Sequence, residues 1–150
     1  MQAAIDRANE GVAAGQSPFG CAISLGGAIV AAEHNRVLAT TDITAHAEIT
    51  ALREACRRAG TIDLSGAVVA STCEPCAMCM AALHWARVEI VYFGATIADA
   101  EAAGFNELAL PAADVLRLGR SSVQLTGGIL VEECRQLFRD WAGTPGHRAY

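Results

Sequence analysis

The stretches His46-Ala47-Glu48 and Pro75-Cys76-Ala77-Met78-Cys79 lie about thirty residues apart and decide how this chain is interpreted. One His and two Cys supply three protein ligands, whereas zinc prefers four ligands in a tetrahedron. A structural zinc site fills the fourth position with protein. A catalytic site leaves it to water, whose pKa zinc lowers from about 16 to about 7. The pattern therefore predicts a catalytic zinc site with His46, Cys76 and Cys79 as ligands and Glu48 as the group that moves protons beside it.

Other kinds of site use similar cysteine spacing. The pattern C-x-x-C-x-x-C over residues 73–79 begins an iron–sulfur motif, but that motif needs a fourth Cys followed by Pro, and position 83 is Leu83. A redox pair of the C-x-x-C type would leave His46 and Glu48 without a role. A closed structural zinc site with Cys73 as its fourth ligand stays open as an alternative, and we favour the catalytic site.

Length and cysteine content bound the class of protein. A chain of 150 residues makes one ordinary domain, which buries about 68–70% of its unfolded surface and needs no disulfide. We see no charged-then-apolar leader at the N-terminus and no apolar run long enough to span a membrane. Six Cys without a leader are typical of a reducing compartment. We therefore expect a single domain over residues 1–150 in the cytoplasm.

Charge and hydropathy indicate the kind of partner. The formal net charge is −5 and the pI is about 5.3, whereas nucleic-acid binders usually present a basic face. The chain is also apolar, with a mean hydropathy of +0.30, and such a small domain often buries part of its surface against a copy of itself. We therefore expect no nucleic-acid or membrane partner, and burial of some of the surface against a second copy of the chain.

Hydrophobic periodicity and turn residues predict a helix, a hairpin and then alternating helices and strands. The hairpin turns at Gly26-Gly27. The predicted helices are 2–14, 46–59, 76–87, 97–103, 112–118 and 129–141, and the predicted strands are 19–25, 28–32, 67–71, 88–93 and 123–125. This order predicts an α/β domain with a mixed sheet covered by helices on both faces.

The predicted ligands all fall at helix starts. Cys76 and Cys79 are spaced i, i+3 and share one helix face, so both can reach one ion. Free N–H groups at a helix start favour thiolate over thiol. His46 and Glu48 are less simply placed, because i and i+2 lie about 200° apart on a regular helix. Glu48 must therefore reach round the first turn.

The pairing of H-x-E with P-C-x-x-C is the signature of the zinc-dependent nucleobase deaminases. Further matching residues extend over most of the chain: Pro18-Phe19-Gly20, Asn35, Thr44 to Glu48, Ser71 to Cys76, Trp85-Ala86-Arg87 and Ala103-Gly104-Phe105. On these residues the chain resembles the cytidine-deaminase-like superfamily, and within it the bacterial guanine deaminases. The tRNA adenosine deaminases share the metal motifs, but typically have Leu in place of Cys73 and more basic charge. The resemblance implies a three-layer α/β/α fold around a five-stranded mixed sheet, and a homodimer.

The resemblance also implies which residues meet the substrate. Asn35 would hydrogen-bond the base, while Phe19 and Trp85 would form the walls of the pocket; core packing is the alternative role of these two aromatic residues. Backbone N–H groups at Ala47 and at Cys76 would contact the substrate or the zinc-bound oxygen. Guanine deaminases tend to have two acidic residues after Gly-Phe, and here the pair is Asn106-Glu107. Glu107 could still accept hydrogen bonds from the N–H edge of the base, from a side chain one methylene longer.

The C-terminal segment 143–150 is polar, contains Gly and Pro, and ends in Tyr150. Most domain ends are disordered, which is one interpretation. In the guanine deaminases that this chain resembles, the C-terminal segment crosses to the partner subunit and closes the active site with a Tyr. By this resemblance Tyr150 would complete the pocket of a partner subunit.

These inferences together predict zinc-dependent hydrolytic deamination of a free nucleobase or base analogue, with one Zn²⁺ per subunit and release of ammonia. Guanine or a related aminated purine, triazine or pyrimidine is the expected substrate. The alternatives are a tRNA adenosine deaminase, or a deaminase of cytosine, cytidine or guanosine. A non-catalytic zinc module is disfavoured because it has no need of Glu48.

Overall fold

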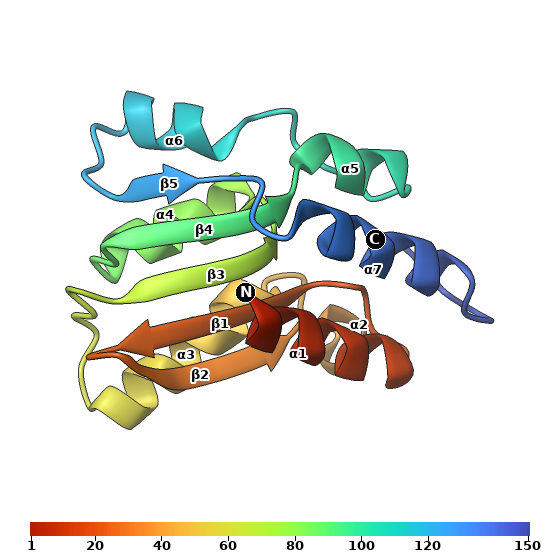
Figure 1. Ribbon diagram of the computed structural model, residues 1–150, viewed down its shortest axis with the longest axis horizontal. Coiled ribbons are helices and arrows are strands. Elements are labelled where there is room, and N and C mark those ends of the chain that lie inside the picture. Colours follow the sequence, from red (N-terminus) through yellow and green to blue (C-terminus); the bar gives the residue numbers. More distant parts are fainter.

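Figure 1 shows the computed structural model of the protein, which describes residues 1–150. Its strands are β1 (Gly20–Leu25), β2 (Ala28–His34), β3 (Val68–Cys73), β4 (Ile90–Ala95) and β5 (Gln124–Thr126). Its helices are α1 (Gln2–Ala13), α2 (Val37–Thr40), α3 (Ala47–Ala59), α4 (Ala77–Trp85), α5 (Ile97–Ala102), α6 (Ala112–Leu118) and α7 (Val131–Ala142). The sheet has the order β2-β1-β3-β4-β5, with α1 and α7 on one face and α3 and α4 on the other (Figure 1). The predicted three-layer α/β/α fold with a five-stranded mixed sheet is confirmed.

Strand β3 is the central strand of the sheet. Strand β1 runs antiparallel to both β2 and β3, whereas β3, β4 and β5 are parallel. The parallel pair β3 and β4 is connected through α4, which begins directly after the carboxyl end of β3. In α/β sheets, ligands bind beyond the carboxyl ends of the strands, so this end is the expected position of a site.

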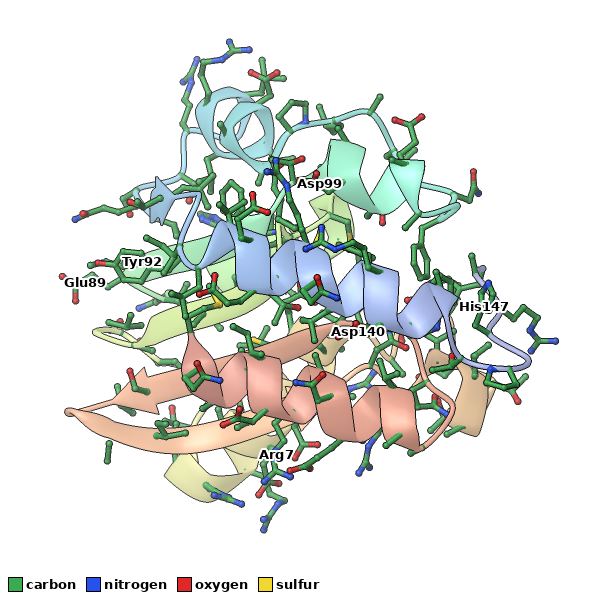
Figure 2. The ribbon with its side chains drawn as sticks, turned by 45° about the vertical axis from the view of Figure 1, so that its right-hand side comes forward. Arg7, Glu89, Tyr92, Asp99, Asp140 and His147 are labelled. Carbon is green, nitrogen blue, oxygen red and sulfur yellow. The ribbon has the colours of Figure 1, made fainter.

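Two hydrophobic clusters hold the layers together. The larger cluster contains 18 buried residues and lies between the sheet and the helices α3 and α4. The second packs α1 and α7 against the sheet and includes Phe105, Phe138 and Trp141. Figure 2 shows α1 and α7 side by side across this second face. Helix α1 approaches the sheet closely because Gly20 has no Cβ, and a Cβ there would overlap the carbonyl oxygen of Ala4.

Local differences from the sequence-based expectation are confined to short segments. The four-residue helix α2 was not expected, and it interrupts the segment between β2 and α3. Strand β3 continues to Cys73, two residues beyond the predicted end, because Cys73 still pairs with Ala95 of β4. No helix of the structure combines the length and the apolar character that crossing a membrane requires.

Candidate active site

The three predicted ligands meet beyond the carboxyl end of β3. His46 is the N-cap residue of α3, Cys76 is the N-cap residue of α4, and Cys79 lies in the first turn of α4. The Nδ1 atom of His46 lies 3.7 Å from Sγ of Cys76 and 3.6 Å from Sγ of Cys79. All three ligand atoms lie within 4.8 Å of one another.

This spacing fits a tetrahedral zinc ion. Zinc binds sulfur at about 2.3 Å and nitrogen at about 2.0–2.1 Å, so that a tetrahedral angle holds the two atoms about 3.6 Å apart. The observed distances of 3.7 and 3.6 Å agree with that value. Two thiols and one imidazole are also donors that zinc prefers. The group therefore fits zinc in its donor types and in its two nitrogen–sulfur distances, and offers three protein ligands.

Glu48 lies directly beside this group, although it is only two residues from His46. His46 has an extended backbone, with φ −62° and ψ 157°, and stands outside the regular helix. The 200° separation expected along a helix therefore does not apply, and Glu48 reaches the ligands from the first turn of α3. The Cys79 thiol lies 3.4 Å from Oε2 of Glu48, and the Ser71 hydroxyl donates to Oε1 at 3.2 Å.

The surroundings of Glu48 favour proton transfer. Its side chain is buried, and burial, followed by the negative charge of Cys76, raises its pKa above the ordinary value. A carboxyl group with a raised pKa exchanges protons more readily near neutral pH. The Cys79 thiol first, and then His46, lower the pKa of Cys76 to about 4, which favours its thiolate. The same hydrogen bond and burial raise the pKa of Cys79, so the two thiols share one proton when no metal is bound.

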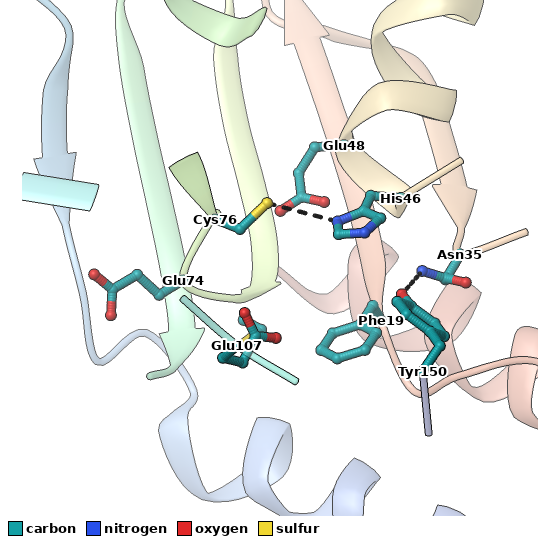
Figure 3. Close-up of a pocket in the computed structure, with 9 residues that line it drawn as sticks. Phe19, Asn35, His46, Glu48, Glu74, Cys76, Glu107 and Tyr150 are labelled. Carbon is teal, nitrogen blue, oxygen red and sulfur yellow. Dashed lines mark hydrogen bonds between the residues drawn. The ribbon is translucent and has the colours of Figure 1, made fainter. Parts of the chain in front are cut away.

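Four of the predicted substrate residues line the same cavity. Phe19, Asn35, Glu107 and Tyr150 surround the His46–Cys76–Glu48 centre (Figure 3). They come from the loop before β1, the residue after β2, the loop between α5 and α6, and the C-terminus. Residues that are far apart in the sequence therefore line one cavity.

Asn35 presents a donor to the cavity. Its Oδ1 accepts a hydrogen bond from the backbone N–H of Val37 at 3.1 Å, and its Nδ2 donates to the hydroxyl of Tyr150 at 2.6 Å. The first bond fixes which end of the amide faces inwards. On the opposite side, Glu107 is a half-buried carboxylate whose pKa is raised by burial. The cavity thus has a donor on one wall and an acceptor on another.

The C-terminal segment closes this cavity within one chain. The Tyr150 ring lies 5.9 Å from the His46 ring and 5.7 Å from the Phe105 ring, and its carbonyl accepts a hydrogen bond from the N–H of Asn106 at 3.2 Å. The inner cavity has a volume of about 20 Å³, enough for about one water molecule, and a pocket of about 260 Å³ that is also lined by His46, Cys76 and Tyr150 adjoins it. With Tyr150 in this position, the inner cavity alone is too small for a heterocyclic base. Exchange of this segment between subunits stays a prediction.

The prediction that Trp85 forms a wall of the pocket is wrong for the single chain. Trp85 ends α4, nine residues beyond Cys76, which is about 13 Å along a helix at 1.5 Å per residue. Its side chain is 75% exposed and does not line the cavity. Ala47 is fully buried, and no acceptor within the chain binds its backbone N–H or that of Cys76. Both N–H groups stay free for a ligand.

Two residues that the sequence analysis did not assign to the pocket also line the cavity. Cys73 lies on the wall, but its thiol faces the carbonyl oxygen of Thr96 at 3.4 Å and is not part of the ligand group. The closed structural site with Cys73 as fourth ligand is therefore not formed. Glu74 is the second residue, and its position directly before Pro75-Cys76 was the available signal.

Comparison with known proteins agrees with this geometry. The family model of the cytidine and deoxycytidylate deaminase zinc-binding region matches residues 1–95, which contain all three ligands and Glu48. The chain belongs to this deaminase family. The His46, Cys76 and Cys79 group lies within the matched zinc-binding region, and zinc is the metal that this region and the donor set indicate.

Individual members of the family cover most of the chain. A guanine deaminase from Bacillus subtilis (strain 168) is 44% identical over 108 residues, which are 71% of this chain and 69% of that protein. A protein crystallised in complex with 2,6-diaminopurine superposes with a TM-score of 0.87 and 29% identity, over 98% of this chain and 82% of the other. A tRNA-specific adenosine deaminase from Agrobacterium fabrum (strain C58 / ATCC 33970) is 39% identical over 95 residues, 63% of this chain and 62% of that protein.

Proposed function

We propose that this protein catalyses the zinc-dependent hydrolytic deamination of a free nucleobase or base analogue, with release of ammonia. Guanine is the first candidate, and a related aminated purine, triazine or pyrimidine is the alternative. The single observation that carries the proposal is the buried carboxylate of Glu48 beside a His, Cys, Cys group. A purely structural zinc site has no use for such a carboxylate. The similarity to a guanine deaminase and to a protein that holds 2,6-diaminopurine supports a small purine as substrate.

His46, Cys76 and Cys79 are the proposed ligands of one zinc ion per subunit. When bound, the ion supplies a Lewis acid that lowers the pKa of a water molecule at the open fourth position. The free N–H groups of Ala47 and Cys76 are suited to donate to an oxygen that becomes negative during the reaction.

Glu48 is the proposed proton carrier. It accepts a proton from the attacking water and delivers it to a ring nitrogen, while the water oxygen bonds to the ring carbon that bears the amino group. Glu48 then moves the second proton of that water to the amino group, which leaves as ammonia. One of its oxygens accepts a hydrogen bond from the Ser71 hydroxyl, which helps to keep the carboxylate in one orientation through both transfers.

Asn35, Glu107, Phe19 and Tyr150 are the proposed substrate residues. The Asn35 amide donates towards an acceptor on the ring, and Glu107 accepts from an N–H group. A guanine ring offers both acceptors and N–H donors on its edges. The Phe19 ring packs at 4.8 Å from the Phe105 ring, which fixes its position at the cavity wall. A base must displace Tyr150 from Asn35 to bind, after which the segment can close over it.

Action on a nucleic acid is the second candidate, because tRNA-specific adenosine deaminases are also similar to this chain. The surface does not favour it. Of the 11 Lys and Arg residues, eight arginines are paired with acidic side chains. Phosphate contacts need unpaired cations, and each contact makes binding fall with salt. A free base carries no phosphate and suits the acidic chain better.

We propose a cytoplasmic homodimer as the working form. Two large apolar side chains, Ile43 and Leu108, lie at the mouth of the site and are 62% and 66% exposed. Exposed apolar groups beside an active site are suited to burial against a second copy. Sedimentation analysis tests this assembly, and a monomer at all concentrations would contradict it.

Ammonia release tests the proposed function directly. The purified protein is assayed with guanine, guanosine, isoguanine, ammeline, cytosine, cytidine and adenine at low and high salt. We expect a free base to be the best substrate and its turnover to be independent of salt. Inosine formation in a tRNA anticodon loop is measured in parallel. Efficient editing of that loop with no release of ammonia from any free base would contradict the proposal.

A further inference from the structure

Glu74 lies between β3 and α4, and its side chain binds the starts of two other helices, α5 and α6. Its Oε1 accepts a hydrogen bond from the backbone N–H of Ala112 at 2.9 Å, and its Oε2 accepts one from the N–H of Ile97 at 3.3 Å. Ile97 is the first residue of α5, and Ala112 is the first residue of α6. Helix starts have N–H groups without partners in the helix, so one carboxylate satisfies two of them.

The two helices connected in this way bracket the loop that carries Glu107. After Phe105, residues 106–111 belong to no helix or strand. Their backbone N–H groups bond only locally, except for the bond from Asn106 to the carbonyl of Tyr150. That single bond goes to the C-terminal segment that covers the cavity. Glu74 holds the start of α5, which precedes the loop, and the start of α6, which directly follows it.

Figure 3 shows that the Glu74 carboxylate points away from His46 and Cys76, whereas Glu107 faces the cavity. Glu74 therefore acts through the loop and does not touch the reacting atoms. Helix α6 depends on it most, because its N-cap residue is Pro111, which provides no side-chain cap. Helix α5 has its own capping box from Thr96 and Asp99, so a change at Thr96 weakens the same helix start but leaves Glu74 in place.

We propose that Glu74 is a positioning residue that fixes Glu107 at the cavity by holding both ends of the segment 97–112. The role in substrate binding rests on the function proposed above, whereas the anchoring of the segment does not. The carboxylate is needed because both of its oxygens are in use. An amide in its place offers one acceptor, and turns a donor towards the other N–H.

Hydrogen–deuterium exchange tests the anchoring without any substrate. In Glu74→Ala and Glu74→Gln, we expect faster exchange over residues 103–112 and unchanged exchange over α4. Faster exchange over the whole chain would mean general destabilisation, and unchanged exchange would mean no anchoring; either result overturns the proposal. Glu74→Gln keeps the size of the side chain, so it provides the test if Glu74→Ala does not fold.

Kinetics test the link to Glu107. We expect Glu74→Ala to raise KM for the best base by about 10- to 100-fold, the range for loss of a hydrogen bond to a charged group, with kcat within a few-fold and zinc content unchanged. Thr96→Ala should leave KM unchanged. In the double variant Glu74→Ala/Glu107→Ala, KM should equal that of Glu107→Ala alone, because both changes remove one interaction. The proposal would be overturned if the increase of KM in the double variant equalled the product of the two single increases. Loss of zinc in Glu74→Ala, or an unchanged KM in Glu107→Ala, would overturn it as well. A protein that releases ammonia from no base would instead contradict the proposed function, and the exchange result would still stand.

Discussion

Asn35 and Tyr150 are joined by a hydrogen bond of 2.6 Å across 115 residues of sequence. This bond holds the last residue of the chain over the candidate metal site. It also occupies one of the two N–H donors of the Asn35 amide nitrogen, whose orientation Val37 fixes through the amide oxygen. A base that accepts from this N–H group competes with the Tyr150 hydroxyl for it.

Changes at Tyr150 test this relationship. Tyr150→Phe removes the hydroxyl that holds the base-free form closed, so KM should fall by about 2- to 12-fold, the equivalent of about 0.5–1.5 kcal/mol. Deletion of residues 147–150 removes the whole cover of the cavity and should instead weaken turnover through kcat, KM or both, with zinc content unchanged. Steady-state kinetics and metal analysis provide the measurement, and Tyr92→Phe on β4 is the matched control. Parent-like constants in both variants would show that Tyr150 takes no part in the pocket.

Asn35→Asp replaces an amide that donates a hydrogen bond into the cavity by a carboxylate of the same size that can only accept. One carboxylate oxygen can still accept from Val37, so the melting temperature should change little. The other oxygen turns an acceptor towards the base, and it also offers the Tyr150 hydroxyl a charged partner. Both effects oppose binding, and KM should rise by an amount equivalent to about 1–3 kcal/mol. An unchanged KM would remove Asn35 from substrate recognition.

Ser71→Ala tests how Glu48 is oriented. The Ser71 hydroxyl donates to Oε1 of Glu48 at 3.2 Å inside the core. Its loss should lower kcat by about 2- to 12-fold, the range for one neutral hydrogen bond, and leave KM and zinc content unchanged. Ser24→Ala on β1 removes a hydroxyl that contacts only the carbonyl of Val68 and serves as the control. Equal effects of the two variants would contradict the role of Ser71.

Zinc content tests the ligand group. Cys79→Ser and His46→Ala should each lose most of the bound zinc, because a hydroxyl or a methyl group does not replace the soft donor. The melting temperature should fall as well, since a metal that binds only the folded chain stabilises it. Cys56→Ser lies outside the site and should retain zinc. Full zinc occupancy in Cys79→Ser, measured by mass spectrometry of the metal, would show that the ligand set is wrong.

The sequence predicted most of the fold because its signals are local. The Gly26-Gly27 turn, Pro75 at the start of α4 and the apolar strands each appear within a few residues. The ligands could be predicted from spacing alone, since Cys76 and Cys79 share one helix turn. The position of Trp85 could not, because a motif match carries no information on the direction in which α4 leaves the site. The two hydrogen bonds of Glu74 could not be predicted either. Its partners are the backbone N–H groups of Ile97 and Ala112, and every residue type except Pro has such a group.

The extended backbone of His46 is another feature that only the structure provides. Regular helical geometry would separate His46 and Glu48, and the N-cap conformation brings them together. Any residue pattern that places a ligand at the N-cap of a helix and a carboxylate two residues later can use the same arrangement.

The most direct test of the whole account is turnover by zinc-loaded Glu48→Gln. Gln matches Glu in size and keeps hydrogen-bonding atoms near Ser71 and Cys79, but it cannot carry a proton. The account predicts one zinc per subunit, a parent-like melting temperature, and a kcat for the best base that falls by at least about 10²–10⁴-fold. A zinc-loaded variant that releases ammonia within about tenfold of the parent rate would contradict the account, because an effect that small lies below the range expected for general acid–base catalysis.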